Sequence, residues 1–450
     1  MSSHTHTEPQ TEAQTSAEPS RAAQVKEASR KHVFTSWSAQ AGLDQLPLAG
    51  GEGAHFWDFE GNRYLDLTSQ LVNVNIGYQH PKLVAAIQQA AGELVTIGPG
   101  FDSESRAEAA RMISERAPEG MSKVFFTNSG AEAVENAIRL ARIHTGRHKM
   151  LAAYRSYHGA THGAISLTGE GRRLGSEPGI PGVVHFWGPY LYRSAFHATS
   201  EQEESERALE HLRQTVQFEG PDRIAAIILE PVVGSNGILV PPPGYLEGVR
   251  ALCDEHGIML IADEVMAGFA RTGQWFAIQN WDVRPDLITF AKGVNSGYVP
   301  LGGVVLSDEI AATFDERPYP GGLTYSGHAL ACASAVASMQ IMEEEGILEH
   351  VRELDRTVFG PGLRALAEHE VVGDVRGLGA FWALELVADK ETREPLGAKR
   401  MGAIGRACKA EGVWPLIMAN RVHVVPPCVI TEDEAHRAID ILGRALDSAL

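Results

Sequence analysis

The sequence predicts an α/β fold in which helices cover both faces of a mainly parallel sheet, with a smaller α+β domain beside it. From about residue 80, short apolar strands alternate with helices, which is typical of parallel sheets. Strands are predicted at 124–126, 224–229, 258–262 and 287–291, and a helix at 131–144 follows the first of them. A long helix near 329–345, a strand at 381–386 and an amphipathic last helix indicate the smaller domain.

The first eighty residues are expected to lie outside the large domain. The segment 1–30 is polar and has no apolar stretch of the kind found in secretory signals, so we expect a disordered tail that is ordered only near Lys31. Strands at 54–59 and 63–67 around a turn at 60–62 predict a hairpin in the segment 31–79, which would join the small domain. The large domain is expected over 80–335 and the C-terminal small domain over 336–450.

Composition narrows the class of protein and its partners. The chain has 450 residues, 44% hydrophobic and 21% charged, which is ample for a folded core. With 39 Lys and Arg against 57 Asp and Glu, the net charge of −18 argues against nucleic acid or an anionic membrane as the main partner. Long apolar runs are absent from the sequence, so a membrane-spanning helix is not expected. Four scattered cysteines without a CxxC pair argue against zinc or a redox dithiol and fit a reduced, cytoplasmic setting.

The first candidate site is the segment Thr127-Asn-Ser-Gly-Ala-Glu132, which follows a strand and opens a helix. Ser129 with Glu132 three residues later matches a capping box, and Gly130 allows a ligand to approach the backbone closely. Free N–H groups at the start of a helix suit a phosphate group. Taken alone, however, the segment is explained better by an ordinary capped helix.

Two charged residues follow apolar strands. Asp263 comes at the end of one strand, where it would face the ligand crevice of a doubly wound sheet, although a helix N-cap is an equal alternative. Lys292 comes at the end of the next strand, where an amine is costly to bury unless it is used. A desolvated amine is a good nucleophile toward carbonyl groups, and the alternative is a lysine that reaches the surface.

Aromatic side chains in the segment Tyr154-Arg-Ser-Tyr-His-Gly159 could stack on a flat cofactor, although a ring that covers the edge of the core is the commoner role of a lone tyrosine. A phosphate cradle, a carboxylate, a lysine and a stacking ring are together what pyridoxal 5′-phosphate (PLP) requires. Its aldehyde reacts with a lysine, a carboxylate keeps its ring nitrogen protonated, and its phosphate binds backbone N–H groups.

Six motifs occur in the chain in a characteristic order. They are Thr127-Asn-Ser-Gly-Ala-Glu-Ala-Val-Glu-Asn-Ala-Ile-Arg139, Tyr157-His-Gly159, Leu229-Glu-Pro231, Ala262-Asp-Glu-Val265, Phe290-Ala-Lys-Gly293 and Leu323-Thr-Tyr-Ser-Gly-His328. With them the sequence resembles the class III aminotransferases, PLP enzymes of fold type I, over nearly the whole chain from about Lys31.

The resemblance implies a role for each matching residue. Lys292 would bind the aldehyde of PLP covalently and then move a proton between the substrate and the cofactor, and Asp263 would pair with the ring nitrogen. Val265 and Tyr157 would pack on the two faces of the ring. The other expected cofactor contacts are the phosphate ligands Ser129, Gly130 and Ala131, the neighbouring residues His158 and Glu230, and Thr324, which would reach the phosphate of the adjacent subunit. That last contact implies a homodimer with shared active sites and leaves a tetramer open.

Three positions bear on the substrate. Ser235 stands where the 4-aminobutyrate and ornithine branch carries a glutamate, which weakens the case for that branch. Val72 stands where many amine–pyruvate members carry a tryptophan, so the pocket is expected to be wider or to be refilled by Trp57 or Tyr154. Arg421 is expected to bind the anionic group of a substrate, and a surface salt bridge is the alternative.

The C-terminal segment around Arg421 aligns poorly with the family. Leu416 occupies one position where the substrate arginine is expected, and His423 is expected to be a packed strand histidine rather than a second polar contact. The stretches Ser69-Gln-Leu-Val-Asn-Val-Asn-Ile76 and Val422-His-Val-Val-Pro-Pro427 nevertheless resemble members assigned to taurine or related ω-amino acids.

The expected function is a ping-pong transfer of the amino group of an ω-amino acid or aminosulfonate, such as taurine or β-alanine, to pyruvate or 2-oxoglutarate. The first alternative is a primary amine–pyruvate transaminase, and a less favoured one is an enzyme like glutamate-1-semialdehyde aminomutase, which keeps the nitrogen. A PLP-fold protein without activity would be expected to lack Lys292 or Asp263, and both are present. A nucleotide-binding enzyme is not indicated, because neither a GxxxxGK[ST] nor a GxGxxG signature opens a helix.

Overall fold

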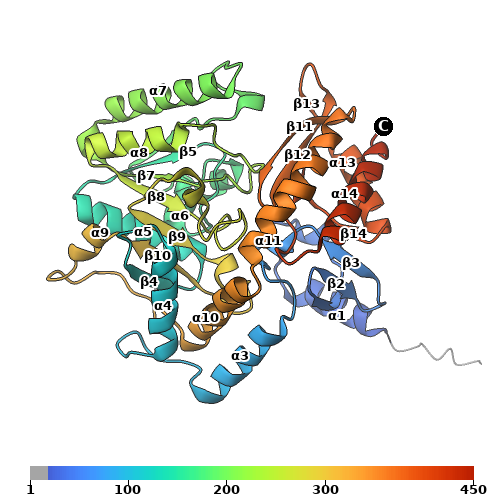
Figure 1. Ribbon diagram of the computed structural model, residues 1–450, viewed down its shortest axis with the longest axis horizontal. Coiled ribbons are helices and arrows are strands. Elements are labelled where there is room, and N and C mark those ends of the chain that lie inside the picture. The colour runs from blue at the N-terminus through green and yellow to red at the C-terminus, as the bar shows by residue number, and fades with distance from the viewer. Residues whose placement is uncertain (1–18) are drawn as a thin grey trace, which may run out of the picture. The chain divides into compact units, whose positions relative to one another are not determined.

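Strands and helices alternate along most of the chain, as Figure 1 shows for the computed structural model, which describes residues 19–450. The described residues divide into two units: the chain up to Gly50 together with Phe56–Arg63, and Gly51–His55 together with Tyr64–Leu450. The α-helices are α1 (Arg21–His32), α2 (Ser69–Val72), α3 (Pro81–Glu93), α4 (Glu104–Arg116), α5 (Gly130–Thr145), α6 (His162–Leu167), α7 (Glu201–Glu219), α8 (Tyr245–His256), α9 (Asp308–Ala312), α10 (Ala329–Glu344), α11 (Ile347–Leu354), α12 (Gly360–Ala365), α13 (Ala398–Ala410) and α14 (Glu432–Asp447). The strands are β1 (Leu48–Glu52), β2 (His55–Asp58), β3 (Arg63–Asp66), β4 (Lys123–Thr127), β5 (Lys149–Ala153), β6 (Val183–Phe186), β7 (Ile224–Leu229), β8 (Met259–Asp263), β9 (Leu287–Phe290), β10 (Gly302–Leu306), β11 (Val372–Leu378), β12 (Phe381–Asp389), β13 (Glu394–Pro395), β14 (Val413–Trp414), β15 (Leu416–Met418) and β16 (Arg421–Val424).

The smaller unit contains a helix that the sequence analysis did not expect. Helix α1 begins at Arg21, ten residues before the point where we expected the chain to become ordered, and the rest of the expected tail, residues 1–18, lies outside the described residues. Ser20 caps this helix by accepting the N–H of Ala23 at 3.2 Å, and Lys26 forms an ion pair with Asp44. Local capping and one ion pair therefore hold a segment whose composition alone suggested disorder.

The predicted turn at 60–62 is present between β2 and β3. Asp58 Oδ1 accepts the N–H groups of Glu60 at 3.0 Å and Asn62 at 2.9 Å. Gly61 takes a φ of +86°, a backbone conformation that favours glycine. The two predicted strands lie within the expected ranges, each ending one residue earlier.

Seven strands form the large sheet, in the order β4-β10-β9-β8-β7-β5-β6. Neighbouring strands from β9 to β6 run parallel, whereas β10 is antiparallel to both of its neighbours. The predicted α/β fold with a mainly parallel sheet is thereby confirmed. The antiparallel β10 was not expected, because its glycine-rich start at Gly302 weakened the strand pattern in the sequence.

Helices cover both faces of this sheet, and alternate residues of β7 show why. Ile228 packs with Val134 of α5 in one apolar cluster. Ile227 lies in another cluster with Leu212 of α7 and Val249 of α8, the two upper helices of Figure 1. Because every residue of β7 is buried, the strand appears in the sequence as a continuous apolar run.

The C-terminal segment forms a second, antiparallel sheet in the order β11-β12-β16-β15, with β13 added to β12. Helices α13 and α14 pack together beside it, in red and orange in Figure 1. Helix α14 is capped by Thr431, whose hydroxyl accepts the Glu434 N–H. Strand β14 pairs in parallel with β3 through Val413 and Leu65, so an N-terminal strand and a C-terminal strand meet.

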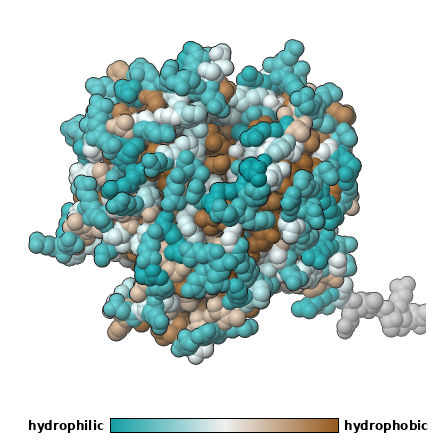
Figure 2. Space-filling view, viewed as in Figure 1, coloured by the Kyte–Doolittle hydropathy of each residue, from teal (hydrophilic) through white to brown (hydrophobic). Residues whose placement is uncertain are grey.

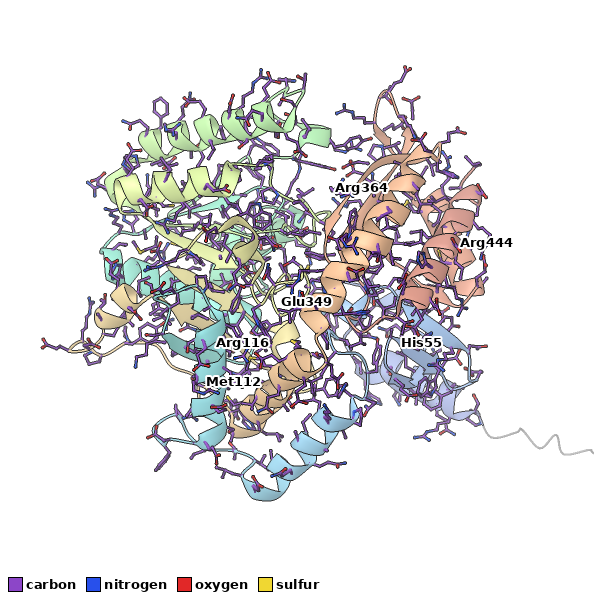
Figure 3. The ribbon with its side chains drawn as sticks, viewed as in Figure 1. His55, Met112, Arg116, Glu349, Arg364 and Arg444 are labelled. Atoms are coloured by element: carbon purple, nitrogen blue, oxygen red, sulfur yellow. The ribbon has the colours of Figure 1, made fainter. Side chains whose placement is uncertain are left out.

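Charged side chains lie mainly on the outer faces of the helices. Arg444 of α14 pairs with Glu411, and Glu349 of α11 pairs with Arg352 (Figure 3). Hydrophilic residues cover most of the face seen in Figure 2, in keeping with the abundance of charged residues. All helices within residues 19–450 are too short or too polar to cross a lipid bilayer.

Candidate active site

The end of β8 places a buried carboxylate at the carboxyl edge of the large sheet. Asp263 is 3% exposed, and the strand register sets it opposite Thr289 of β9. Its Oδ1 accepts the Thr289 hydroxyl at 3.1 Å and the Val265 N–H at 3.2 Å, and its Oδ2 lies 2.7 Å from His158 Nδ1. The helix N-cap alternative is excluded, because no helix of the described chain begins there. Three partners thus fix the direction of this carboxylate.

His158, one of these partners, is itself buried. Its side chain is fully buried, and its backbone N–H donates to the Thr168 hydroxyl at 3.0 Å. Its Nε2 is buried and has no hydrogen-bond partner among residues 19–450. Within residues 19–450, the second nitrogen of the ring therefore stays available for a group outside the described chain.

Lys292 begins a short 3₁₀ turn, Lys292–Asn295, after β9, within electrostatic reach of Asp263. Its φ of +44° lies in the left-handed region, which a lysine adopts only at some cost. Burial lowers the pKa of Lys292 to about 8, against the opposing charges of Asp263 and Glu230. Near neutral pH a fraction of the amine is therefore uncharged and nucleophilic. Lys292 is half-buried, and the desolvation of its amine favours the expected role over a lysine that reaches the surface.

Glu230 follows β7, and the strand register brings it beside the end of β8. Its carboxylate accepts the N–H of Tyr157 at 2.9 Å and that of Gly234 at 2.8 Å. Burial raises the pKa of Glu230 to about 7; Asp263 acts in the same direction and His158 against it. Glu230 thus fixes the backbone of the loop between β5 and α6 that contains Tyr157 (the Tyr157 loop) against the strand ends.

The start of α5 presents unpaired N–H groups. Ser129 Oγ accepts the Glu132 N–H at 3.2 Å, as expected. The Glu132 carboxylate accepts the Asn128 N–H at 2.8 Å, rather than the N–H of Ser129 as a full capping box requires. Because helix-start N–H groups have no partner within the helix, those of Gly130 and Ala131 are available to an anion.

Close packing joins this helix start to the other parts of the site. A Cβ on Gly130 would lie 2.7 Å from Val265 Cγ1, and a Cβ on Gly159 would lie 2.6 Å from Ala131 Cβ. Only glycine fits at these two positions without displacing its neighbours. Val265, the Tyr157 loop and the helix start are therefore held together.

These residues fit the cofactor that the sequence indicated. The nucleophilic amine of Lys292 suits an aldehyde, and the oriented carboxylate of Asp263 suits a protonated ring nitrogen. The free N–H groups at the start of α5 suit the phosphate. The structure thus brings together the phosphate, ring and lysine positions that the sequence analysis named separately.

Three polar residues near the Tyr157 ring, Arg172, Glu170 and Asn236, were not expected from the sequence to belong to the site. The guanidinium of Arg172 lies 3.9 Å from the centre of that half-buried ring and forms an ion pair with Glu170. Asn236 donates from its amide to Glu170 at 3.1 Å. Their positions depend on loops, so no strand or helix pattern pointed to them. Thr289, a polar residue inside an apolar strand, was the one further signal that the sequence offered.

The expected pocket residues occupy different surroundings. Val72 is buried with a φ of +56° and packs in a cluster with Val232 and Ile238. The Tyr154 ring stacks on His185, with 5.3 Å between ring centres. Trp57 belongs to the smaller unit, where its indole covers Gly50. Its expected role in the pocket stays a prediction.

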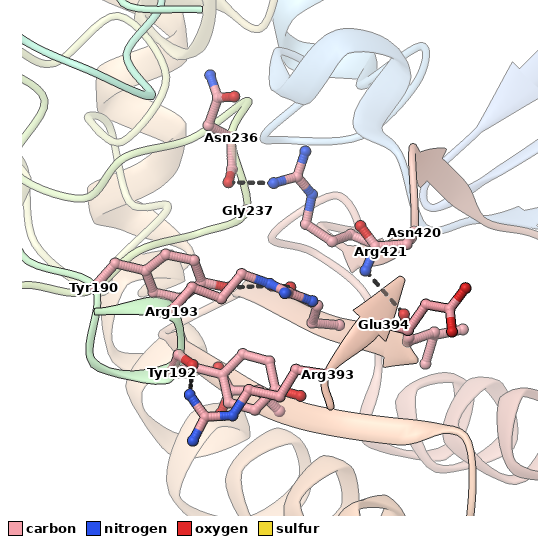
Figure 4. A network of polar contacts seen from close by, with 12 residues as sticks. Tyr190, Tyr192, Arg193, Asn236, Gly237, Arg393, Glu394, Asn420 and Arg421 are labelled. Atoms are coloured by element: carbon pink, nitrogen blue, oxygen red, sulfur yellow. Dashed lines mark hydrogen bonds and ion pairs between the residues drawn. The ribbon is translucent and has the colours of Figure 1, made fainter. Parts of the chain in front are cut away.

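Arg421 lies on β16, where Figure 4 shows its guanidinium beside Asn236. Its Nη1 donates to the Asn236 carbonyl oxygen at 2.6 Å, and its buried Nε has no hydrogen-bond partner among the described residues. Burial lowers the pKa of Arg421, with Glu385 opposing. The alternative of a surface salt bridge is wrong, because the guanidinium forms no ion pair within residues 19–450.

An ion-pair cluster is centred on Glu385, which lies opposite Arg421 in the register of β12 and β16. Figure 4 shows two of its members, Tyr190 and Arg193. Glu385 of β12 accepts the Tyr190 hydroxyl and pairs with Arg193 and with Arg376, the latter at 2.9 Å. Because Glu385 already serves these three donors, it does not neutralise Arg421 by direct contact. Arg421 therefore keeps donors for a ligand.

The structure also locates His423, Leu416 and Thr324. His423 is 1% exposed, and burial lowers its pKa to about 3, so the expectation of a packed strand histidine is confirmed. Leu416 lies opposite it in the register of β15 and β16. Thr324 is exposed between α9 and α10, in a segment tied to β4 by the Ser326 hydroxyl, which donates to Phe126 O at 2.8 Å.

Comparisons with known proteins agree with this geometry. A family model described as aminotransferase class-III matches residues 39–446. A putrescine–pyruvate aminotransferase of Pseudomonas aeruginosa is 36% identical over 412 residues, covering 89% of this chain and 90% of its own. The crystal structure of taurine:2-oxoglutarate aminotransferase from Bifidobacterium kashiwanohense, in complex with PLP and glutamate, has a TM-score of 0.92 and 40% identity, covering 96% of this chain and 98% of its own. An (S)-enantioselective ω-transaminase from Thermomicrobium roseum has a TM-score of 0.92 and 35% identity, covering 96% and 100%.

Proposed function

The chain belongs to the class III aminotransferases, PLP-dependent enzymes of fold type I, and from this premise we propose the reaction that it performs. It moves the amino group of an ω-amino acid or aminosulfonate, of the taurine or β-alanine type, to pyruvate or 2-oxoglutarate. The proposed class of donor rests on Arg421. This partly buried residue has free donors and no carboxylate partner among residues 19–450. The similarity to a taurine:2-oxoglutarate aminotransferase at 40% identity supports the same class of donor.

The catalytic step in this proposal belongs to Lys292 and Asp263. When bound, PLP supplies an electron sink that allows the bond between the donor carbon and its hydrogen to break. The Lys292 amine would accept that proton and deliver it to the cofactor carbon on the other side of the transferred nitrogen, which its lowered pKa permits near neutral pH. Asp263, oriented by His158 and Thr289, keeps the ring nitrogen protonated.

The other expected contacts hold the cofactor in place. Ser129 and the N–H groups of Gly130 and Ala131 bind the phosphate, and Val265 and Tyr157 enclose the ring. The remaining roles are those of Glu230, which fixes the Tyr157 loop, and Thr324, which reaches the phosphate of a second subunit in a homodimer.

The reaction proceeds in two halves. The donor leaves its amino group on the enzyme and departs as a carbonyl compound before the keto acid enters. Both substrates therefore use the same pocket in turn, and Arg421 meets the anionic group of each acidic substrate. Exchange of an amino group between two different molecules separates this reaction from that of an aminomutase.

A primary amine–pyruvate transaminase is the second candidate, and one observation favours it. Val72 stands where the resemblance places a tryptophan in many amine–pyruvate members, so that indole does not wall the pocket here, and Val72 itself packs against Val232 and Ile238. The putrescine–pyruvate aminotransferase at 36% identity shows that a relative uses an amine without a carboxylate.

The half-reaction without acceptor tests these two candidates. The PLP form is mixed with taurine, β-alanine, 4-aminobutyrate or a simple arylalkylamine, and the cofactor absorbance is followed. Fastest conversion by taurine or β-alanine supports the proposal, and conversion by the uncharged amine alone contradicts it. In Arg421→Ala, acidic donors are expected to lose about 2–4 kcal/mol of binding while simple amines are spared. Equal loss for both classes would show that Arg421 is structural.

A further inference from the structure

Arg172 stands in a short 3₁₀ segment, Gly171–Ser176, that is fixed against the end of β5. The Gly169 N–H donates to Ser156 O at 3.1 Å, and the Gly169 oxygen accepts the Arg155 N–H at 3.0 Å. A Cβ on Gly169 would lie 2.1 Å from Ala153 O, so the backbone passes as closely as glycine allows. The segment that carries Arg172 is therefore held beside the Tyr157 loop.

Neighbouring residues satisfy only some of the hydrogen-bond donors of the Arg172 side chain. It is 31% exposed, its Nε pairs with Glu170, and its guanidinium covers the Tyr157 ring at 3.9 Å. Its Nη2 is buried and has no hydrogen-bond partner in the described chain. A buried guanidinium nitrogen without a partner is costly, and an anion that accepts its hydrogen bond removes that cost.

Glu170 is the carboxylate of the chain that pairs with Arg172. It is 16% exposed, and its second oxygen accepts the Asn236 amide at 3.1 Å. The backbone carbonyl oxygen of Asn236 in turn accepts from Arg421. Glu170 thus pairs directly with Arg172 and is connected to Arg421 through Asn236. The group therefore has an excess of positive charge that an incoming anion would balance.

Arg172 also lies within electrostatic reach of the reacting amine. Burial is the main cause of the lowered pKa of Lys292, and the positive charges of Arg172 and Arg271 act in the same direction. The Tyr157 ring, which Arg172 covers, belongs to the loop that Glu230 fixes beside Asp263. A ligand on Arg172 would accordingly lie near the reaction centre rather than on a remote surface.

We propose that Arg172 binds the sulfonate or carboxylate at the far end of the amino donor, and that Glu170 is the internal partner which this anion displaces. The inference rests on the proposed function and deepens it, because it adds a second arginine to the recognition of an acidic donor. A sulfonate presents three acceptor oxygens, which suits two guanidiniums from different segments.

Calorimetric titration of the holoenzyme with 2-hydroxyethanesulfonate tests this directly. That molecule is taurine with a hydroxyl in place of the amine, so it binds without reacting. Arg172→Gln is expected to weaken binding about ten- to hundred-fold, the range for hydrogen bonds to charged groups. Glu170→Gln is expected to strengthen it, because the competing charge is removed. The matched control is Arg173→Gln, whose side chain pairs with Glu177 at 3.6 Å and is expected to leave binding unchanged.

Steady-state kinetics give the second readout. Arg172→Gln should raise KM for taurine and β-alanine at least ten-fold and leave an uncharged amine donor unaffected. Equal damage to charged and uncharged donors, or unchanged binding of 2-hydroxyethanesulfonate in Arg172→Gln, overturns the inference. If Arg172→Gln fails to fold, weaker rather than stronger binding in Glu170→Gln overturns it. Failure of the proposed function is seen separately, as absence of transfer from acidic donors in the unmodified enzyme.

Discussion

The backbone conformation of Lys292 and its buried surroundings determine the position and the pKa of its amine. The left-handed φ of +44° turns the chain directly after β9, and the buried surroundings lower the pKa of the amine to about 8. Both effects cost folding free energy, and they are found where the chemistry needs a neutral, fixed nucleophile. Asp263 beside it is held by His158, whose contact no sequence pattern could predict.

Replacement of this amine tests its role. Lys292→Ala is expected to keep its fold and lose at least about three orders of magnitude in turnover, because the amine that moves the proton in the proposed reaction is removed. Steady-state transfer from a reactive donor measures the loss. Lys149→Ala, which removes a lysine paired with Glu219 at 2.6 Å, serves as the control and is expected to retain turnover. Near-normal transfer by Lys292→Ala would contradict the assignment.

The same residue predicts a pH dependence of stability in the cofactor-free protein. The pKa of Lys292 falls from 10.5 to about 8 on folding, so between these two pH values the unfolded chain binds a proton that the folded chain has lost. The free energy of unfolding therefore rises with pH across that window. Urea titrations of the cofactor-free protein and of Lys292→Met at several pH values check this. The unmodified protein should gain stability relative to the variant from about pH 8 to 10.5, and parallel curves would contradict it.

At the scale of elements, the ends of β7, β8 and β9 and the start of α5 build the site. The sequence alone predicted these strands and this helix, because each strand is a buried apolar run and Ser129 is a good N-cap. It could not predict the strand order, the antiparallel β10 or the contact between Arg172 and Tyr157. Those features depend on how segments far apart in the sequence pack, and loop residues carry no periodic signal.

The cap of α5 has a double role that can be separated. Ser129→Ala should cost about 1 kcal/mol of stability through the lost cap and should also weaken PLP binding. The matched control is Ser200→Ala, since Ser200 caps α7 with the same 3.2 Å contact and is not placed in the site. Thermal unfolding and fluorescence titration with PLP measure the two effects. If both variants lose stability alike and bind PLP alike, Ser129 acts only as a cap.

At the scale of the whole molecule, the proposal implies that a second copy of the chain would complete each site. Thr324 is exposed, and the neighbouring Tyr325 is 60% exposed, in a segment that only the Ser326 hydroxyl ties to β4 among the side-chain hydrogen bonds described. The family resemblance assigns Thr324 to the phosphate of the adjacent subunit. In such a dimer each site combines Lys292 of one subunit with Thr324 of its partner.

Mixing two inactive variants decides whether the sites are shared. Lys292→Ala removes the amine, and Thr324→Asp places a negative charge beside the phosphate. In a mixed dimer, the subunit with Thr324→Asp keeps its own Lys292 and receives an intact Thr324 from its partner, so one site is restored. Random exchange of equal amounts should therefore recover about a quarter of the normal activity, since half of the dimers are mixed and each has one working site. If Thr324 served the site of its own chain, every site would still carry one of the two lesions and the mixture would stay inactive.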